Sequence, residues 1–492
     1  MLIALQQFLQ QDIDQLIQAR SSDQISTQVM EWFKDTVSHV PAYRDFLAQH
    51  AIDPKQVNTL ADFKCLPLID KNNYMTHYPL PTLCRGGKLN PYHLVAVSSG
   101  STGTPLFWPR CRVHELAMSQ RFEQIFHDSF SAHEKSTLVV VCFALGTWVG
   151  GMYSASCCQW LVDKNYPITL ITPGNNKNEI CRVVKALAPH FEQTVLLGYP
   201  PFIKDVLDHG LAAGITWRDY AVKCVFAGEV FSEEWRQLIY DICGTNHYAH
   251  GSASLYGTAD AGVIGNETPL SIHIRRFLSQ NPAVMRELFQ ESRLPTLVQY
   301  DPLQRFIEVQ DNSLIVSGDN GIPLIRYHIA DKGGIVSFQE MLAFLKRHHF
   351  DPLEFFSNGT PGVRELPFVY VFGRMDFTVS YFGANIFPEN IAVALTPAEI
   401  NPSVSGKFVL QVKDNPTGIP FLSIAVELRP DIPASNDLNS RITLEIKQQL
   451  LRLNSEFAHY TPAEYQTPLL TLHPNGDPEY FPPGIKHRYT RR

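Results

Sequence analysis

The sequence lacks the features that mark several common protein classes. Its 9 cysteines form no CxxC pair and none follows Cys243, so the spacing indicates neither a disulfide framework nor a zinc site. The formal net charge of -7 offers no basic field to nucleic acid or to an anionic membrane surface. No basic leader or small-residue cleavage site opens the chain. We therefore expect a protein of a reducing, cytoplasmic compartment that binds no nucleic acid.

One long apolar run resembles a membrane span. Residues 136–162 contain no charged side chain, and the run is long enough to cross a bilayer. However, residues 139–143 are mostly β-branched, and Gly146, Gly150 and Gly151 follow them, as in a buried strand, a glycine-rich turn and a packed helix. The soluble interpretation is favoured, and no membrane span is expected.

A chain of 492 residues, 45% of them hydrophobic, is too long for one compact core. After a helical lead-in over residues 1–90, short apolar segments alternate with amphipathic segments of helix length. This alternation predicts an α/β fold with a mostly parallel sheet covered by helices on both faces. The expected strands are 138–143, 195–198 and 222–227, and the expected helices are 1–17, 176–188, 201–213 and one that starts at Ser232.

The later part of the chain changes character. Short strands with polar turns predict a small β-rich sub-domain over 290–340, still within an N-terminal domain that covers 1–373. A separate α/β C-terminal domain is expected over 374–492. It would contain strands at 407–413, 421–428 and 468–472 and a long helix near 436–457.

The strongest local signal is the segment 98–105, SSGSTGTP, which follows an apolar run. Glycines let the backbone approach a polyphosphate closely, and clustered hydroxyls and amides donate hydrogen bonds to its oxygens. The segment is neither a Walker A loop nor the spaced glycine triplet of a dinucleotide fold. On this segment alone, a phosphate-binding loop and a flexible Ser/Gly loop are equally well supported.

Four further motifs follow it in a fixed order. They are 226–233 FAGEVFSE, 256–260 YGTAD, 324–331 LIRYHIAD, and 373–376 GRMD followed by 383–389 GANIFPE. Together with 98–105, this series resembles the adenylate-forming (ANL) superfamily over roughly residues 30–490. The segments VPAYRDF and LPLIDK near the N-terminus and PLIRY make it similar to the phenylacetate–coenzyme A ligase-like family in particular.

The resemblance implies an AMP-forming acid–thiol ligase with ATP, Mg²⁺ and coenzyme A as cofactors. Such an enzyme binds a small-molecule carboxylic acid, joins it to AMP as an acyl-adenylate, and passes the acyl group to a thiol. The resemblance also assigns roles to individual residues. Phosphate binding falls to Ser98, Ser99, Gly100, Ser101, Thr102, Gly103 and Thr104, and nucleotide binding to Gly228, Glu229, Tyr256, Gly257, Thr258, Asp331 and Arg374.

The remaining roles concern the metal, the hinge, the acid and the catalytic cation. Asp260 stands where the superfamily has a magnesium-binding Glu. Asp376 is the expected hinge between the domains, which the resemblance implies to be the pivot of a mobile C-terminal domain. Lys486 is the candidate catalytic lysine, because the attacking carboxylate and the α-phosphate are both anionic and need a cation between them. An aromatic or otherwise apolar acid is expected against the aromatic side chains of Phe143, Trp148, Tyr153 and Tyr199.

Alternatives stay open at this point. The acyl group could pass to a carrier protein or an amine instead of coenzyme A. Thr104 replaces the lysine usual in the phosphate loop, so a non-catalytic nucleotide-binding homologue is a second alternative. A homodimer is among the assemblies left open.

Overall fold

The computed structural model describes residues 2–17, 20–90, 92–98, 106–147, 149–291, 293–356, 362–373, 379–382, 384–415, 420–482, 487 and 489–491. Helices and strands alternate through most of this length, so the predicted α/β class is confirmed. The helices are α1 Leu2–Gln10, α2 Ile13–Leu16, α3 Ser22–His39, α4 Pro41–Gln49, α5 Leu60–Lys64, α6 Leu80–Leu83, α7 Arg112–Gln124, α8 Val149–Asp163, α9 Lys177–Leu187, α10 Pro200–Ala212, α11 Glu233–Cys243, α12 Pro269–Gln280, α13 Pro282–Phe289, α14 Phe338–Arg347, α15 Pro388–Ala392, α16 Asn436–Leu453 and α17 Ser455–Tyr460.

The strands are β1 Leu94–Val97, β2 Phe107–Arg110, β3 Thr137–Val141, β4 Ile168–Ile171, β5 Gln193–Gly198, β6 Val222–Ala227, β7 Ser252–Thr258, β8 Gly262–Asn266, β9 Thr296–Gln299, β10 Phe306–Gln310, β11 Ser313–Gly318, β12 Leu324–Val336, β13 Phe368–Gly373, β14 Val379–Tyr381, β15 Ala384–Ile386, β16 Val404–Asp414, β17 Pro420–Leu428 and β18 Leu469–His473. They form one large sheet, two hairpins and one small C-terminal sheet.

An eleven-stranded sheet dominates the molecule, in the order β10-β11-β12-β13-β9-β8-β7-β6-β5-β3-β4. Strands β4, β3, β5, β6 and β7 are parallel, whereas each neighbouring pair from β7 to β10 is antiparallel. The predicted β-rich segment is therefore the antiparallel half of the same sheet and forms no sheet of its own. Ligands bind such sheets beyond the carboxyl ends of the parallel strands.

Side-chain alternation explains why helices cover both faces of the parallel half. Along β3, Val139 and Val141 pack into one hydrophobic cluster with α7 and α8, whereas Leu138 and Val140 pack into another with α9 and α10. Successive side chains of a strand point to opposite faces, so a strand buried on both faces has to be apolar at every position. The apolar run in the sequence is therefore a strand of the sheet interior followed by helix α8.

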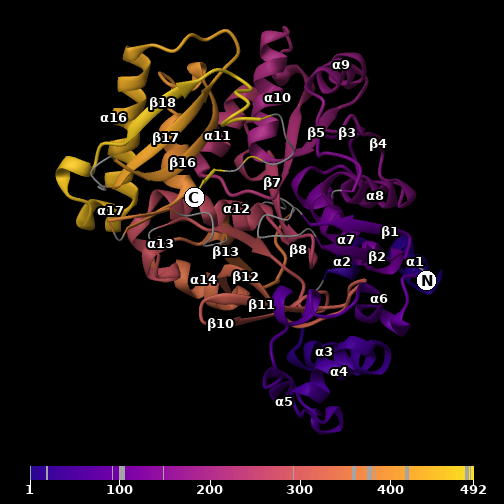
Figure 1. Cartoon of the computed structure of the whole chain (residues 1–492). Coiled ribbons are helices and arrows are strands. Elements are labelled where there is room, and N and C mark those ends of the chain that lie inside the picture. Colours follow the sequence, from indigo (N-terminus) through magenta and orange to yellow (C-terminus); the bar gives the residue numbers. More distant parts are fainter. Residues whose placement is uncertain are drawn as a thin grey trace.

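The C-terminal sheet is separate from the large one. Strands β16 and β17 are antiparallel, β18 pairs in parallel with β17, and helix α16 packs against them. Their apolar side chains form a cluster that draws only on residue 379 and beyond. Figure 1 shows this sheet at the upper left, next to α10 and α11, on the opposite side of the molecule from helices α3–α5.

Two predicted helices are wrong in their extent. The helix expected over 436–457 breaks at Asn454, whose side chain caps the start of α17 by accepting a hydrogen bond from the backbone N–H of Phe457. The helix expected over 1–17 splits into α1 and α2, because Asp12 caps α2 in the same way. In both cases a short polar side chain competes with the helical hydrogen bonds. Within the described part of the chain, no helix has the length and apolarity needed to cross a bilayer.

Matched leucine substitutions test the packing of the parallel half. Leu197 on β5 is fully buried, and Leu211 on α10 is 45% exposed. We expect Leu197→Ala to lower the free energy of unfolding by about 2–5 kcal/mol, because it removes buried methyl groups and leaves a cavity. Leu211→Ala should change it by less than about 0.5 kcal/mol. Urea-induced unfolding measures both, and equal losses would contradict the assignment of β5 to the sheet interior.

Candidate active site

A cavity of about 410 Å³ lies beyond the carboxyl ends of β5, β6 and β7. The structure gathers here predicted site residues from widely separated parts of the chain. All those that it describes line the cavity: Ser98, Phe143, Tyr153, Tyr199, Gly228, Glu229, Tyr256, Gly257, Thr258, Asp260 and Asp331. The position is the one at which α/β sheets bind ligands.

The other predicted residues, Ser99, Gly100, Ser101, Thr102, Gly103, Thr104, Trp148, Arg374, Asp376 and Lys486, lie outside the described residues. The structure does describe residues that directly flank these segments in the sequence. Ser98, Leu106, Val149, Gly373 and His487 all line the cavity. Every predicted segment therefore begins or ends at this site.

Two hydrogen bonds join Ser98 and Leu106, which flank the segment 99–105. The backbone N–H of Ser98 donates to the carbonyl oxygen of Leu106 over 2.9 Å, and the N–H of Leu106 donates to the Ser98 hydroxyl oxygen over 2.9 Å. Strands β1 and β2 continue this pairing from Val97 opposite Phe107. The hairpin thus holds both ends of the segment at the cavity wall.

The segment between β6 and α11 forms a second wall. Gly228 has φ +84°, and a Cβ atom there would lie 2.8 Å from Cε1 of Tyr199, so only glycine fits. The Tyr199 ring meets Phe143 edge-on, with 5.0 Å between ring centroids. Residues Gly228, Glu229, Val230, Phe231 and Ser232 follow one another along this wall, and Phe143, Tyr153 and Tyr199 give it an aromatic side.

Asp331 is held at the cavity by a neighbouring tyrosine. The Tyr256 hydroxyl donates a hydrogen bond of 2.8 Å to Oδ2 of Asp331, and both side chains are buried. A carboxylate fixed in this way has further lone pairs with which to accept hydrogen bonds from a ligand. Sequence reasoning had placed both residues at the nucleotide, but it had not anticipated that they contact each other.

The predicted metal ligand has protein partners already. Nζ of Lys71 forms an ion pair of 3.2 Å with Oδ2 of Asp260, and the Tyr327 hydroxyl donates to the same oxygen over 2.6 Å. Lys71 also lines the cavity, and it is a site residue that sequence reasoning missed. The only signal was its place at the end of the LPLIDK segment.

The described residues do not form a magnesium site by themselves. None of their His, Cys, Asp and Glu side chains come together in groups of three or more that could hold a metal ion. Mg²⁺ in nucleotide sites takes one or two carboxylates and completes its coordination with water and phosphate oxygens. Asp260 offers one such carboxylate, which is paired with the ammonium group of Lys71, and the other ligands would have to come from a nucleotide and water.

Acidic side chains outnumber basic ones among the described residues that line the cavity. The acids are Glu229, Asp260, Asp331 and Glu389, and the bases are Lys71 and Arg293. Burial raises the pKa of Glu389, although Arg293 4.0 Å away opposes the shift. A polyphosphate would therefore find few cationic side chains here and would depend on backbone amides and hydroxyls.

The C-terminal tail enters the cavity from the small sheet. The backbone N–H of Leu410 donates to the carbonyl oxygen of Tyr489 over 2.7 Å, and a ring nitrogen of His487 hydrogen-bonds to the carbonyl oxygen of Phe408 over 2.6 Å. Burial lowers the pKa of His487 to about 4, so the ring is neutral at pH 7. The residue that precedes His487 in sequence is Lys486.

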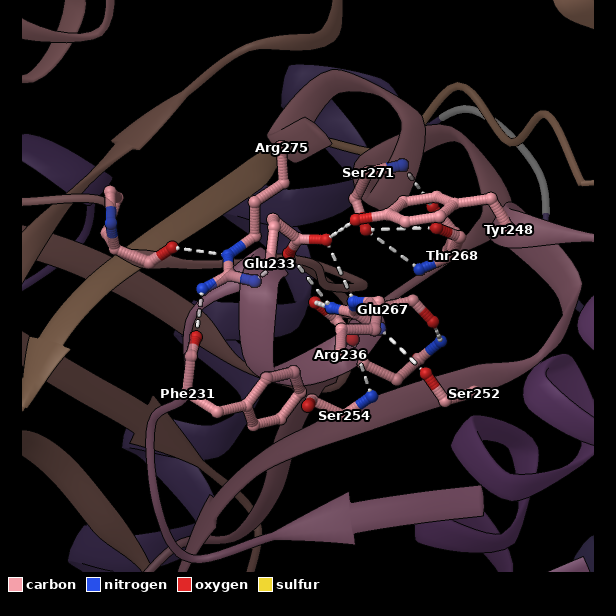
Figure 2. Close-up of polar contacts among 12 residues, drawn as sticks. Phe231, Glu233, Arg236, Tyr248, Ser252, Ser254, Glu267, Thr268, Ser271 and Arg275 are labelled. Carbon is pink, nitrogen blue, oxygen red and sulfur yellow. Dashed lines mark hydrogen bonds and ion pairs between the residues drawn. The ribbon is translucent and has the colours of Figure 1, made fainter. Parts of the chain in front are cut away.

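Behind two of the cavity walls lies a buried network of charges, shown in Figure 2. Arg236 of α11 donates to Glu233 over 3.0 Å, to Glu267 over 2.6 Å and to the Ser252 hydroxyl over 2.8 Å. Arg275 of α12 pairs with Glu233 from the other side. Burial opposes the charge of Arg236, but Glu233 and Glu267 outweigh it and raise its pKa. Two cations thus balance two anions in the interior.

The network is attached directly to residues that line the cavity. Arg275 donates to the carbonyl oxygen of Phe231 over 2.5 Å, and Glu267 accepts a hydrogen bond of 2.8 Å from the backbone N–H of Ser254. The two guanidinium groups also lie 4.9 Å and 5.6 Å from the centre of the Phe231 ring. The segment after β6 and strand β7 are therefore fixed relative to each other.

Comparison with known proteins supports the fold. No family model and no curated protein matches the sequence. A solved structure of 2-hydroxyisobutyryl-CoA ligase in the postadenylation state, bound to an AMP adduct, superposes with a TM-score of 0.67 at 14% identity, covering 94% of this chain and 88% of that one. The same ligase in the thioesterification state, with an AMP adduct and CoA, gives 0.53 at 14% identity, covering 95% and 88%. The chain therefore has the fold of these ligases.

A pair of arginine substitutions tests the network. Arg236→Met should lower the free energy of unfolding by about 3–5 kcal/mol, because it leaves buried carboxylates without their cation. Arg182→Met removes an exposed arginine, 68% accessible and paired with Glu179 on α9, and should leave the free energy of unfolding nearly unchanged. Urea-induced unfolding gives both values, and an Arg236→Met loss as small as the control would show that the network does not stabilise the fold.

Proposed function

We propose that this protein is an AMP-forming ligase that activates a carboxylic acid as an acyl-adenylate and transfers the acyl group to a thiol. The observation that carries the proposal is the convergence of one motif series on one cavity. Likeness to a ligase family predicts that residues at β1, β6, β7, β12 and the C-terminal tail belong to one site. The residues of these segments that the structure describes line one cavity. The fold shared with acyl-CoA ligases supports the same function.

In the first step, a carboxylate oxygen attacks the α-phosphorus of ATP, the bond to the bridging oxygen breaks, and pyrophosphate leaves. The amides and hydroxyls of residues 98–104 would hold the phosphates, and Asp331 would accept hydrogen bonds from the ribose hydroxyls. Phe143, Tyr153 and Tyr199 would pack against an aryl or other apolar acid. We also propose that the protein is related to the phenylacetate–coenzyme A ligases in particular.

Two lysines would supply positive charge in that step. Lys486 would lie between the two anionic reactants, a position supported by the lining residue His487 that follows it. Lys71 would act on the phosphates as well, since it lines the cavity and Thr104 replaces the usual loop lysine. Asp260 orients Lys71 through their ion pair.

In the second step, the thiol of coenzyme A attacks the acyl carbon and AMP leaves. We propose that the unit after Gly373 rotates about Asp376 between the steps, with Gly373 as the domain boundary. Its separate hydrophobic cluster supports this. The rotation would break the ion pairs that join the unit to α10, Lys407 with Asp205 and Arg429 with Asp208. The chain superposes better on the postadenylation structure of 2-hydroxyisobutyryl-CoA ligase than on the thioesterification structure of the same ligase. This difference also fits a movable unit.

The primary test is ATP–pyrophosphate exchange over a panel of aryl, aliphatic and amino acids. We expect at least one apolar acid to stimulate exchange, and coenzyme A to convert that acid to a thioester. Lys486→Ala should reduce exchange by about 100-fold or more, while ATP binding persists. Pyrophosphate release without a thioester would point to a carrier protein or an amine as acceptor. ATP binding without any exchange would identify a non-catalytic homologue.

Lys71→Met tests the second cation. The variant should raise the KM for ATP and slow exchange by about tenfold or more, because a charge that contacts the phosphates is lost. Lys71→Arg should retain part of the activity, and Lys55→Met, at an exposed lysine of the same region, should have none of these effects. Unchanged kinetics for Lys71→Met would remove Lys71 from the site.

A further inference from the structure

A second cluster of reactive groups lies outside the cavity, where β2 ends and α7 begins. Cys111 occupies the N-cap position of α7, and its Sγ lies 3.0 Å from Nδ1 of His114. Nε2 of the same ring lies 3.1 Å from Oδ1 of Asp319. A nucleophile, a base and a carboxylate that orients the base are thus connected in one line. None of the three is among the described residues that line the cavity.

The carboxylate in this cluster is held by a rigid turn. Gly321 approaches β2 so closely that a Cβ atom on it would lie 1.8 Å from the carbonyl oxygen of Pro109. Arg305 donates a hydrogen bond of 2.7 Å to the side-chain oxygen of Asn320. Arg85 donates one of 3.0 Å to the backbone carbonyl oxygen of Asn320. The turn that carries Asp319 is therefore fixed against the strand that leads into Cys111.

The electrostatics of the cluster favour a thiolate beside an imidazolium. Burial opposes ionisation of Cys111, but the hydrogen bond with His114 and its positive charge outweigh burial and lower the thiol pKa. Asp319 and Cys111 raise the pKa of His114 against the effect of burial. The Asp319 pKa is lowered to about 2 by His114 and Arg85, although burial opposes this shift too. Asp35 pairs with Arg85 at the edge of the cluster, and the α7 N-terminus adds a positive dipole end.

We propose that Cys111 is a nucleophilic thiolate that His114 and Asp319 activate, and that it takes a low-molecular-weight disulfide as its reaction partner. The Cys111 thiolate attacks one sulfur of the disulfide, a mixed disulfide forms, and the disulfide's own S–S bond breaks. The other sulfur leaves as a thiolate and takes the proton from the His114 imidazolium. The step needs no further oxidant, because the disulfide is reduced as Cys111 is oxidised.

The other cysteines provide the comparison within the same molecule. Cys142, Cys157 and Cys158 are fully buried, and burial raises the pKa of each. Such thiols are inert while the protein stays folded. Cys65 is exposed and serves as the accessible reference thiol.

The test is alkylation of the intact protein by iodoacetamide between pH 5.5 and 9.5, with each cysteine quantified by peptide mass spectrometry. We expect Cys111 to react about tenfold faster than Cys65 near pH 6.5, where an ordinary thiol is largely protonated. The ratio should fall as pH rises, because ordinary thiols are reactive as thiolates at higher pH. With an aromatic disulfide as probe, the mixed disulfide should form first at Cys111.

Two variants separate activation from mere access. His114→Asn should move the rise of the Cys111 rate to higher pH, and Asp319→Asn should do so to a smaller extent. The rate at Cys65 should not change, and protection of Cys142, Cys157 and Cys158 confirms that each variant is folded. If the rate at Cys111 follows the same pH curve as that at Cys65, or if His114→Asn leaves its curve in place, the proposal is wrong.

Discussion

The four buried charges of Glu233, Arg236, Glu267 and Arg275 are the interaction on which the site depends. They join the start of α11, the end of β8 and the middle of α12, at the point where the sheet changes from parallel to antiparallel pairing. Burying charge is costly unless each ion has its partner, so a shift of one of these elements would leave a buried charge unpaired. That arrangement sets the distance between two walls of the cavity.

The cavity combines an aromatic side with polar groups that are mostly held by other residues. Asp331 is fixed by Tyr256, and Asp260 by Lys71 and Tyr327. Side chains fixed in this way lose little further conformational freedom when a ligand binds. Because the described charges at the cavity are mainly acidic, selectivity for an anionic ligand has to come from oriented amides and from a few lysines.

Much of the fold could be predicted from the sequence because it depends on local patterns. The β3, β5 and β6 runs are apolar at nearly every position, and the helix that begins after Ser232 has a capping serine. The breaks at Asp12 and Asn454 were missed because a capping side chain within an amphipathic pattern is a weak signal. Motif likeness predicted the site residues that the structure describes, except Lys71. Its pairing with Asp260 joins two segments that nothing in the local sequence connects.

The double hydrogen bond between Ser98 and Leu106 also bears on how this protein could be altered. Both hydrogen bonds use groups of Ser98 and Leu106 alone, so the closure of the hairpin does not depend on the side chains between these two residues. Substitutions between the two residues would leave the donors and acceptors of this closure in place. Loops taken from other enzymes could be grafted between the same two anchors, which makes this hairpin a natural exchange point for engineering.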